Sequence, residues 1–336
     1  MRNTVTTLGT LIGLATVFLV SACQQPSPSP ASISYQYNVS RTIKTVDEID
    51  LTYHLDIPDA QTQRPLMLII DGSSCRGPKP GLFNIMRPDE SAPSPYARLI
   101  VEKIGVGLED DGSSCSDLYL QNYSIEDRVF QHMRALQHIR KTAQWWNGDL
   151  LLWGWSDGGD VAARLTAYYP KTKRAVLGGM GGGLTMEEHF KDIISCQPDK
   201  FPTATERQPC LDHYTEIFTD IRNNPTWQKT WSGDDNSYKV WETRLFARLS
   251  ILLADNAAPI LIVHGEDDHY ATPVQSARKL VADLKAEGNS AYTYWEIKDM
   301  GHSFGPDDDD KRRLYLDAMR DWLLIDGVKQ PAITPQ

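Results

Sequence analysis

The sequence predicts an α/β fold in which a mostly parallel central sheet carries helices on both faces. Short apolar runs alternate along the chain with longer amphipathic stretches, the pattern of parallel strands joined by crossover helices. Some runs, such as 66–70, are apolar throughout, as expected of strands that are buried on both faces. With 336 residues, 41% of them hydrophobic, the chain is long enough to bury a large core.

The first residues differ from the rest of the chain. A charged start precedes an apolar run at 8–20 that is too short for a membrane span, so residues 1–22 are predicted to be a secretory signal peptide. Residues 20–23, Val-Ser-Ala-Cys, resemble the lipobox of bacterial lipoproteins, which implies cleavage before Cys23 and diacylation of that cysteine. The alternative is an ordinary signal peptide that has a cysteine near its end.

Residues 23–34 are rich in proline and serine and are predicted to form an extended tether, with folded structure beginning near Tyr35. Acyl chains on Cys23 would anchor the protein to a bacterial membrane. In lipoproteins an Asp after the cysteine retains the protein at the inner membrane. Gln24 stands there instead, so the resemblance implies the periplasmic side of the outer membrane.

The charge and the cysteines narrow the possible partners and the compartment. The formal net charge of −10 leaves no basic excess for binding a nucleic acid. Export implies an oxidising compartment in which disulfides persist. Apart from Cys23, the cysteines are Cys75, Cys115, Cys196 and Cys210; they allow three pairings, and their spacing alone does not select one.

Strands and helices follow from the apolar runs and the residues that flank them. Strands are predicted at 51–57, on an edge of the sheet, and at 66–70, 106–108, 150–153, 174–177, 259–263 and 292–297. Ser94 and Pro95 look like an N-cap and a first-turn proline, which predicts a helix to Ile104 that ends at Gly105. Further helices are predicted at 124–141, from the turn at 154–159 to Tyr169, at 273–286 and at 311–325.

The stretch at 184–258 breaks the alternation of strands and helices. It carries Trp227, Trp231 and Trp241 and contains helical pieces without an obvious strand, so it is predicted to be a helical cap inserted over the sheet. The core then comprises 35–183 and 259–326, followed by a C-terminal tail at 327–336. The tryptophans could line an acyl pocket, but packing in an aromatic core is the more ordinary role for any one of them.

The residues Gly154-Trp155-Ser156-Asp157-Gly158 match the pattern Gly-x-Ser-x-Gly. An apolar strand precedes them and a helix of small residues follows, which is the context of a nucleophile elbow. Glycines flank the serine because side chains there would clash with the strand and helix around a tight turn. The motif therefore predicts Ser156 as a nucleophile.

A serine nucleophile needs a histidine base and a carboxylate that orients the histidine. The sequence 264–268, His-Gly-Glu-Asp-Asp, follows a buried strand, and Gly301-His302 follows the last strand. In these residues the chain resembles the α/β-hydrolase family from about 50 to 325. The resemblance implies Asp268 as the acid and His302 as the base, with Asp267 and Glu266 as competitors for the acid.

The same resemblance implies an oxyanion hole of two backbone N–H groups. One is expected from Asp157. The other is expected from the loop after the strand at 66–70, where Ser73 and Ser74 are the candidates, although the His-Gly-Gly motif of many family members is absent.

The pentapeptide Asp-Gly-Ser-Ser-Cys occurs at 71–75 and again at 111–115. Both copies follow predicted parallel strands, whose carboxyl ends carry the site in such sheets. A disulfide between Cys75 and Cys115 would join the two loops, and one between Cys196 and Cys210 would close a short loop in the cap.

The predicted activity is hydrolysis of a small-molecule carboxylic ester through an acyl-enzyme, with no metal or organic cofactor. A serine peptidase of the prolyl oligopeptidase type is the alternative, although those enzymes usually carry an amino-terminal propeller. A surface lipoprotein that binds without catalysis is a further alternative. Asp157, with Glu266 and Asp267 nearby, could favour a cationic substrate, but complementing the start of its helix is the more ordinary role for Asp157.

Overall fold

The structure is a computed structural model that describes residues 39–78, 86, 94–231, 236–302 and 309–324. Contacts divide the chain into residues 1–33 and 34–336, and all described residues belong to the second unit. The predicted signal peptide at 1–22, Cys23, the tether at 23–34 and the tail at 327–336 lie outside the described residues. No helix among the described residues is both long and apolar enough to cross a membrane.

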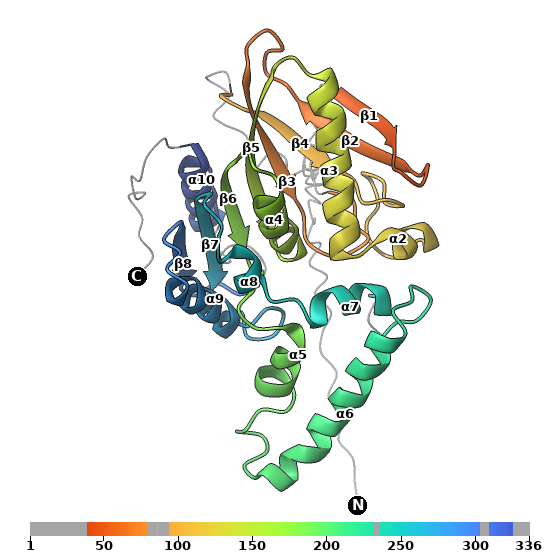
Figure 1. Ribbon diagram of the computed structural model, residues 1–336, viewed down its shortest axis with the longest axis vertical. Coiled ribbons are helices and arrows are strands. Elements are labelled where there is room, and N and C mark those ends of the chain that lie inside the picture. Colours follow the sequence, from red (N-terminus) through yellow and green to blue (C-terminus); the bar gives the residue numbers. More distant parts are fainter. Residues whose placement is uncertain (1–38, 79–85, 87–93, 232–235, 303–308, 325–336) are drawn as a thin grey trace, which may run out of the picture. The chain divides into compact units, whose positions relative to one another are not determined.

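The predicted mostly parallel sheet is confirmed, but the strand predicted on an edge at 51–57 is the second strand of the sheet, because residues 39–44 pair with its outer side. Its eight strands in the described residues follow the order β1-β2-β4-β3-β5-β6-β7-β8. The hairpin of β1 and β2 pairs antiparallel, β2 pairs antiparallel with β4, and all pairs from β4 to β8 are parallel (Figure 1). The strands are β1 (Val39–Lys44), β2 (Asp50–Asp56), β3 (Arg64–Ile70), β4 (Ala97–Val101), β5 (Trp146–Trp155), β6 (Thr172–Gly178), β7 (Ile260–Gly265) and β8 (Tyr292–Ile297).

Helices cover both faces of this sheet, because alternate residues of the apolar strands point to opposite sides. On one face Leu66 and Leu68 belong to a core cluster with residues of α3 (Ile125–Thr142), α4 (Asp157–Tyr168) and α9 (Val274–Ala286). On the other face Met67 and Ile69 belong to a cluster with residues of α10 (Asp309–Leu324). These four helices confirm the predicted helices apart from the one at 94–104.

The predicted helix at 94–104 and the predicted strand at 106–108 are both wrong. Residues 97–101 form β4, and every one of them is buried. Arg98, the charged residue of this run, pairs with Asp56 and is buried inside the fold. Burial on both faces favours a strand, and this outweighs the capping signal of Ser94 and Pro95. Residues 106–108 instead form turns, with Val106 N–H donating to the Lys103 carbonyl (3.0 Å).

The insertion between β6 and β7 is helical, as predicted. It contains α5 (Met186–Glu188), a π-helical turn (His189–Ile194), α6 (Ala204–Asn223), α7 (Tyr238–Leu245) and α8 (Leu249–Leu253). Figure 1 shows α5, α6 and α7 beyond the carboxyl ends of the parallel strands. A separate short helix, α2 (Asp117–Asn122), precedes α3. The cap thus lies at the end of the sheet where the connecting loops place functional side chains.

Candidate active site

Ser156 lies in the tight turn between β5 and α4. Its φ is +57°, a backbone conformation that costs free energy for a residue with a side chain and is common at functional sites. A Cβ at Gly154 would overlap the Gly158 carbonyl, and a Cβ at Gly158 would overlap the carbonyls of Ile70 and Asp71. The two glycines therefore allow the strand, the turn and the helix to pack closely enough to present the serine.

Three side chains from separate loops meet in one hydrogen-bonded line at this turn. His302 Nε2 lies 3.0 Å from Ser156 Oγ, and His302 Nδ1 lies 2.7 Å from Asp268 Oδ2. Because the carboxylate accepts a hydrogen bond from Nδ1–H, the other ring nitrogen, Nε2, is left to accept the proton of the serine hydroxyl. Asp267 does not take part: its side chain is exposed and lies 3.9 Å from His269.

Asp268 is held as a carboxylate by the groups around it. Burial opposes its ionisation, but hydrogen bonding with His264 and His302 outweighs this and lowers the pKa of the carboxyl. Its Oδ1 also accepts from the Thr272 amide at 3.1 Å. His264 Nε2 donates to the Thr272 carbonyl (2.6 Å), so this buried histidine supports the loop of the acid and does not reach the serine.

Comparison with known proteins gives the same fold. The profile of the prolyl oligopeptidase family matches residues 160–324, which include Asp268 and His302 but begin after Ser156. Est1E from Butyrivibrio proteoclasticus, solved with ferulic acid bound, superposes with a TM-score of 0.57 at 16% identity over 84% of this chain and 98% of its own. No curated protein matches the sequence at a significant level.

Two peptidases are also similar in structure. A candidate dipeptidyl aminopeptidase IV from Bacteroides ovatus has a TM-score of 0.55 at 14% identity, and the acylaminoacyl peptidase of Pyrococcus horikoshii has one of 0.57 at 11%. They align with 85% and 88% of this chain, which spans only 35% and 43% of theirs. The chain has the α/β-hydrolase fold. With its elbow serine in contact with a histidine and an aspartate, it is a serine hydrolase.

Contacts between loops keep the histidine of this α/β hydrolase close to the elbow. Trp155 Nε1 donates to the His302 carbonyl at 2.9 Å, so the residue before the nucleophile holds the loop of the base. A Cβ at Gly265 would overlap the Met300 carbonyl, which explains the need for glycine beside His264. The Asp267 amide donates to the same carbonyl at 2.9 Å.

Asp157, the residue after the nucleophile, is not a free anion. Its carboxylate pairs with Arg244 of α7 and accepts from the Tyr123 hydroxyl at 2.7 Å. Burial raises its pKa, but Arg244 and Tyr123 outweigh burial, and the net shift is downward. Since Arg244 neutralises this charge, Asp157 gives no support to the expectation of a cationic substrate.

The residues predicted for the oxyanion hole lie in two segments, the start of α4 and the loop after β3. The Asp157 amide is the first of α4, at a helix N-terminus whose N–H groups lack helical partners. Gly72 lies against the serine: a Cβ on it would be 3.3 Å from Ser156 Cβ. Ser73 and Ser74 follow and are exposed, and Ser74 has a φ of +92°.

Both expected disulfides are present. Cys75 bonds Cys115 with a Cα–Cα distance of 5.3 Å, and Cys196 bonds Cys210 with one of 5.7 Å. Beside the first disulfide, Arg76 and Asp111 form an antiparallel bridge, so the end of the first copy of the pentapeptide lies beside the second copy. The second copy follows β4 through a long turn segment, not the strand that was expected at 106–108.

The cavity at the serine is small and has mixed walls. Met180, Leu184 and Leu249 give it an apolar side, and Asp160, His189 and Arg244 add polar groups. Burial raises the pKa of Asp160 to about 6 despite its ion pair with Arg164.

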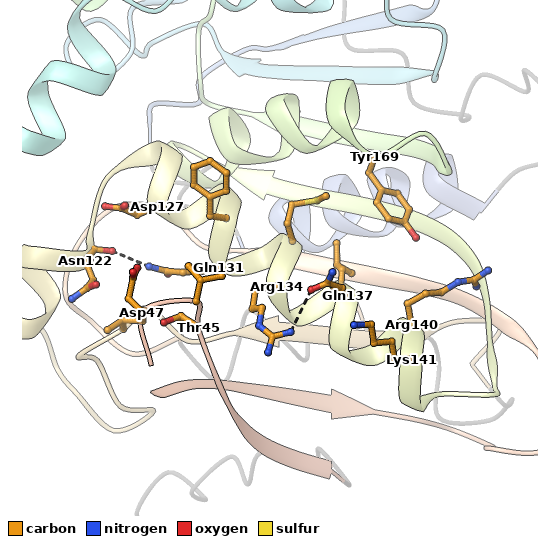
Figure 2. Close-up of a pocket in the computed structure, with 15 residues that line it drawn as sticks. Thr45, Asp47, Asn122, Asp127, Gln131, Arg134, Gln137, Arg140, Lys141 and Tyr169 are labelled. Carbon is orange, nitrogen blue, oxygen red and sulfur yellow. Dashed lines mark hydrogen bonds between the residues drawn. The ribbon is translucent and has the colours of Figure 1, made fainter. Parts of the chain in front are cut away.

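A larger cavity of about 600 Å³ lies elsewhere, between α3 and the turn that joins β1 to β2. Figure 2 shows its labelled polar residues. Among them, Gln131 donates a hydrogen bond to the Asn122 carbonyl, and Arg134 donates one to the side chain of Gln137. Its lining holds neither a histidine nor a cysteine that could serve as base or nucleophile, so the catalytic site is placed at Ser156.

Sequence patterns did not indicate four charged or aromatic residues near the site. Lys103, Tyr123, Arg128 and Arg244 come from three separate segments and contact Asp71 or Asp157. None belongs to a motif. Only the tertiary fold brings them to the elbow, so no local signal could have identified them.

Proposed function

We propose that this serine hydrolase cleaves carboxylic esters through an acyl-enzyme on Ser156. His302 removes the hydroxyl proton as the serine oxygen attacks the ester carbonyl, and then protonates the departing alcohol. Water, activated by the same histidine, releases the acid in the second half of the cycle. Asp268 stabilises the imidazolium that forms in each half, and this chemistry calls for no cofactor.

The hydrogen-bonded line Ser156–His302–Asp268, with distances of 3.0 and 2.7 Å, is the observation that carries the proposal. Three further observations favour an ester. Est1E holds ferulic acid, a carboxylic acid of the kind that ester hydrolysis releases. The small cavity at the serine has an apolar side that suits a short acyl chain, and the ion pair with Arg244 leaves Asp157 unable to attract a substrate ammonium group.

A serine peptidase is the second candidate function, and specific findings favour it. The matching family profile is that of the prolyl oligopeptidase family, and two similar structures are described as peptidases. The same three side chains would attack a peptide carbonyl, with His302 protonating the amine that leaves. The two candidates differ in the leaving group and in how the substrate is held, not in the catalytic residues.

Matched substrates separate the two candidates. A set of acyl groups would be presented once as p-nitrophenyl esters and once as p-nitroanilides, with Ser156→Ala as the control for background hydrolysis. For an esterase we expect kcat/KM on esters to exceed that on anilides for every acyl group, and peptidyl anilides to show no measurable turnover. Efficient cleavage of peptidyl anilides would instead establish the peptidase.

We also propose that the enzyme acts at a membrane surface, anchored through Cys23. The support is the lipobox-like sequence, and the two disulfides fit an oxidising compartment. Expression in a Gram-negative host and fractionation of its membranes would test this. We expect the protein in the outer membrane fraction, and a Cys23→Ala variant outside that fraction.

A further inference from the structure

The loop after β3 passes directly over the nucleophile. A Cβ on Gly72 would lie 3.5 Å from the Trp155 carbonyl and 3.8 Å from Ser156 Oγ. The backbone of 71–73 is therefore close enough to the serine to contact the oxygen of a bound carbonyl. The orientation of its peptide groups decides whether it offers N–H donors or carbonyl oxygens to that oxygen.

Arg128 of α3 sets this orientation from beneath the loop. Its Nη1 donates to the Asp71 carbonyl at 2.8 Å and to the Gly72 carbonyl at 3.3 Å, and its Nη2 donates to Asp71 Oδ1 at 2.8 Å. Lys103 pairs with the other oxygen of the same carboxylate. Both cations are almost fully buried, with 1% of Arg128 and 4% of Lys103 exposed, so the loop is held by a desolvated ion cluster.

A planar trans peptide points its C=O and N–H in opposite directions. Because the Gly72 carbonyl faces Arg128, the N–H of Ser73 faces away from Arg128. In the described part of the chain this N–H has no hydrogen-bond partner. The geometry thus favours Ser73 over Ser74 as the donor opposite Asp157.

The second copy of the pentapeptide shows what Arg128 changes. There, Asp111 Oδ1 accepts from the Ser113 amide at 2.8 Å, the usual local turn of an aspartate. The equivalent amide in the first copy is that of Ser73. Asp71 does not bind it, because Arg128 and Lys103 hold both carboxylate oxygens. The amide of the first serine is therefore hydrogen-bonded in the second copy, at Ser113, and free in the first copy, at Ser73.

We infer that Arg128 is a positioning residue: by holding Asp71 and the two carbonyls it leaves the N–H of Ser73 free to act as the second oxyanion donor, which the resemblance to the α/β-hydrolase family leads us to expect from this loop. This inference rests on the proposed acyl transfer at Ser156. In the transition state the substrate oxygen becomes an oxyanion, which accepts hydrogen bonds from the amides of Ser73 and Asp157. Arg128 itself does not touch the substrate.

Replacement of Ser73 by proline tests the donor, because proline has no N–H. Ser73 is exposed and does not have a positive φ, the backbone region that would exclude proline outright. The readout compares an aryl ester with the matched thionoester, whose sulfur accepts hydrogen bonds only weakly. We expect Ser73→Pro to lower kcat on the ester by about 10²–10³-fold while thionoester hydrolysis changes far less.

Ser113→Pro is the matched control, since it places proline at the same position of the twin loop. We expect it to keep the wild-type ratio of ester to thionoester hydrolysis. A wild-type ratio in Ser73→Pro, with Ser156 still reactive, would overturn the assignment of the donor alone. If Ser156→Ala hydrolysed the ester as fast as the wild type, the hydrolase proposal itself would fail.

Arg128→Lys tests the positioning role, because an ammonium keeps the charge but lacks the fork that reaches two carbonyls and a carboxylate. We expect kcat on the ester to fall by about tenfold or more with KM nearly unchanged and the thionoester little affected. Arg98→Lys is the control, since Arg98 is equally buried and pairs with Asp56 away from the site. Equal losses on ester and thionoester in Arg128→Lys would show a purely structural role and contradict the inference.

Discussion

The sheet and the cap are stabilised in different ways. The sheet is held by long-range burial: Leu66, Leu152 and Ile262 on one face are almost inaccessible to solvent and belong to a single large cluster. The cap has a much smaller cluster around Phe218, Trp241 and Leu245. It adds local devices, namely the Cys196–Cys210 bridge and capping boxes at the starts of α5 and α6.

The two regions therefore contribute differently to the site: the sheet fixes the positions of the catalytic residues, and the cap shapes the access to them. The catalytic side chains follow β5, β7 and β8, so their distances are set by the rigid part of the molecule. The cap contributes walls to the cavity and one charged contact, Arg244 to Asp157, at the elbow. Changes in the sheet loops should therefore abolish chemistry, whereas changes in the cap should alter stability and access.

The largest expected effect concerns the acid of the triad. Asp268→Asn should lower kcat by about 10⁴-fold, because the amide no longer holds the histidine in the tautomer that accepts the serine proton. Steady-state hydrolysis of a p-nitrophenyl ester measures this. The control is Asp267→Asn, one residue away and exposed, which should stay close to wild type. If Asp267→Asn lost the activity and Asp268→Asn kept it, the acid of the triad would be assigned to the wrong residue.

The contact between cap and elbow should have the next largest effect. Arg244→Met leaves the buried Asp157 carboxylate without its cation and should destabilise the fold by about 3–5 kcal/mol. Adding Asp157→Asn removes the unpaired charge and should recover part of this loss. Urea unfolding of both single variants and the double variant gives the coupling free energy between Arg244 and Asp157. If the two losses simply added, Arg244 and Asp157 would not be coupled.

The disulfide of the cap should contribute less to stability, and its contribution should be confined to the cap. Its cysteines are 14 residues apart, so replacing both Cys196 and Cys210 by serine should cost about 3 kcal/mol in the chain-entropy model. Limited proteolysis should then cut within 184–258 sooner than elsewhere, while Ser156 keeps its reactivity. Faster cleavage of the sheet region would show that cap and core unfold together.

A smaller effect on the free energy of unfolding is expected when the pH is lowered. Burial, reinforced by nearby Arg128, lowers the pKa of His132 to about 3, whereas the unfolded value is near 6.5. The unfolded chain thus takes up a proton below pH 6.5 that the folded protein does not, and stability falls as the pH drops. Between pH 7 and pH 5.5 this amounts to about 1 kcal/mol. In urea unfolding at several pH values, His132→Asn should remove this part of the dependence of the free energy of unfolding on pH. An unchanged dependence on pH would contradict the role of His132.

Local patterns were enough to predict most of the sheet and the helices beside it. The buried runs at 66–70 and 259–263 are strands, and the stretch capped by Ser124 is a helix. The pattern failed at 94–108, where Ser94, Pro95 and Gly105 resembled the ends of a helix, but the chain forms a buried strand that carries the charge of Arg98. That charge is tolerated because Asp56, distant in sequence, neutralises Arg98.

The candidate site divides in the same way. The elbow motif predicted Ser156, and the resemblance of two strand-to-loop turns to the α/β-hydrolase family implied Asp268 and His302. Spacing could not choose between Ser73 and Ser74, nor identify Arg128 and Arg244. Their roles depend on which distant side chains lie beneath the loops, and the sequence order does not contain that information.

Labelling of the intact protein with a fluorophosphonate, followed by peptide mass spectrometry, tests the central assignment most directly. Phosphonylation requires a serine activated by its base, so we expect one adduct, on Ser156, and none in Ser156→Ala or His302→Ala. Absence of an adduct in the wild-type protein would show a binding protein with an inactive elbow, and an adduct on another serine would show that the catalytic site lies elsewhere.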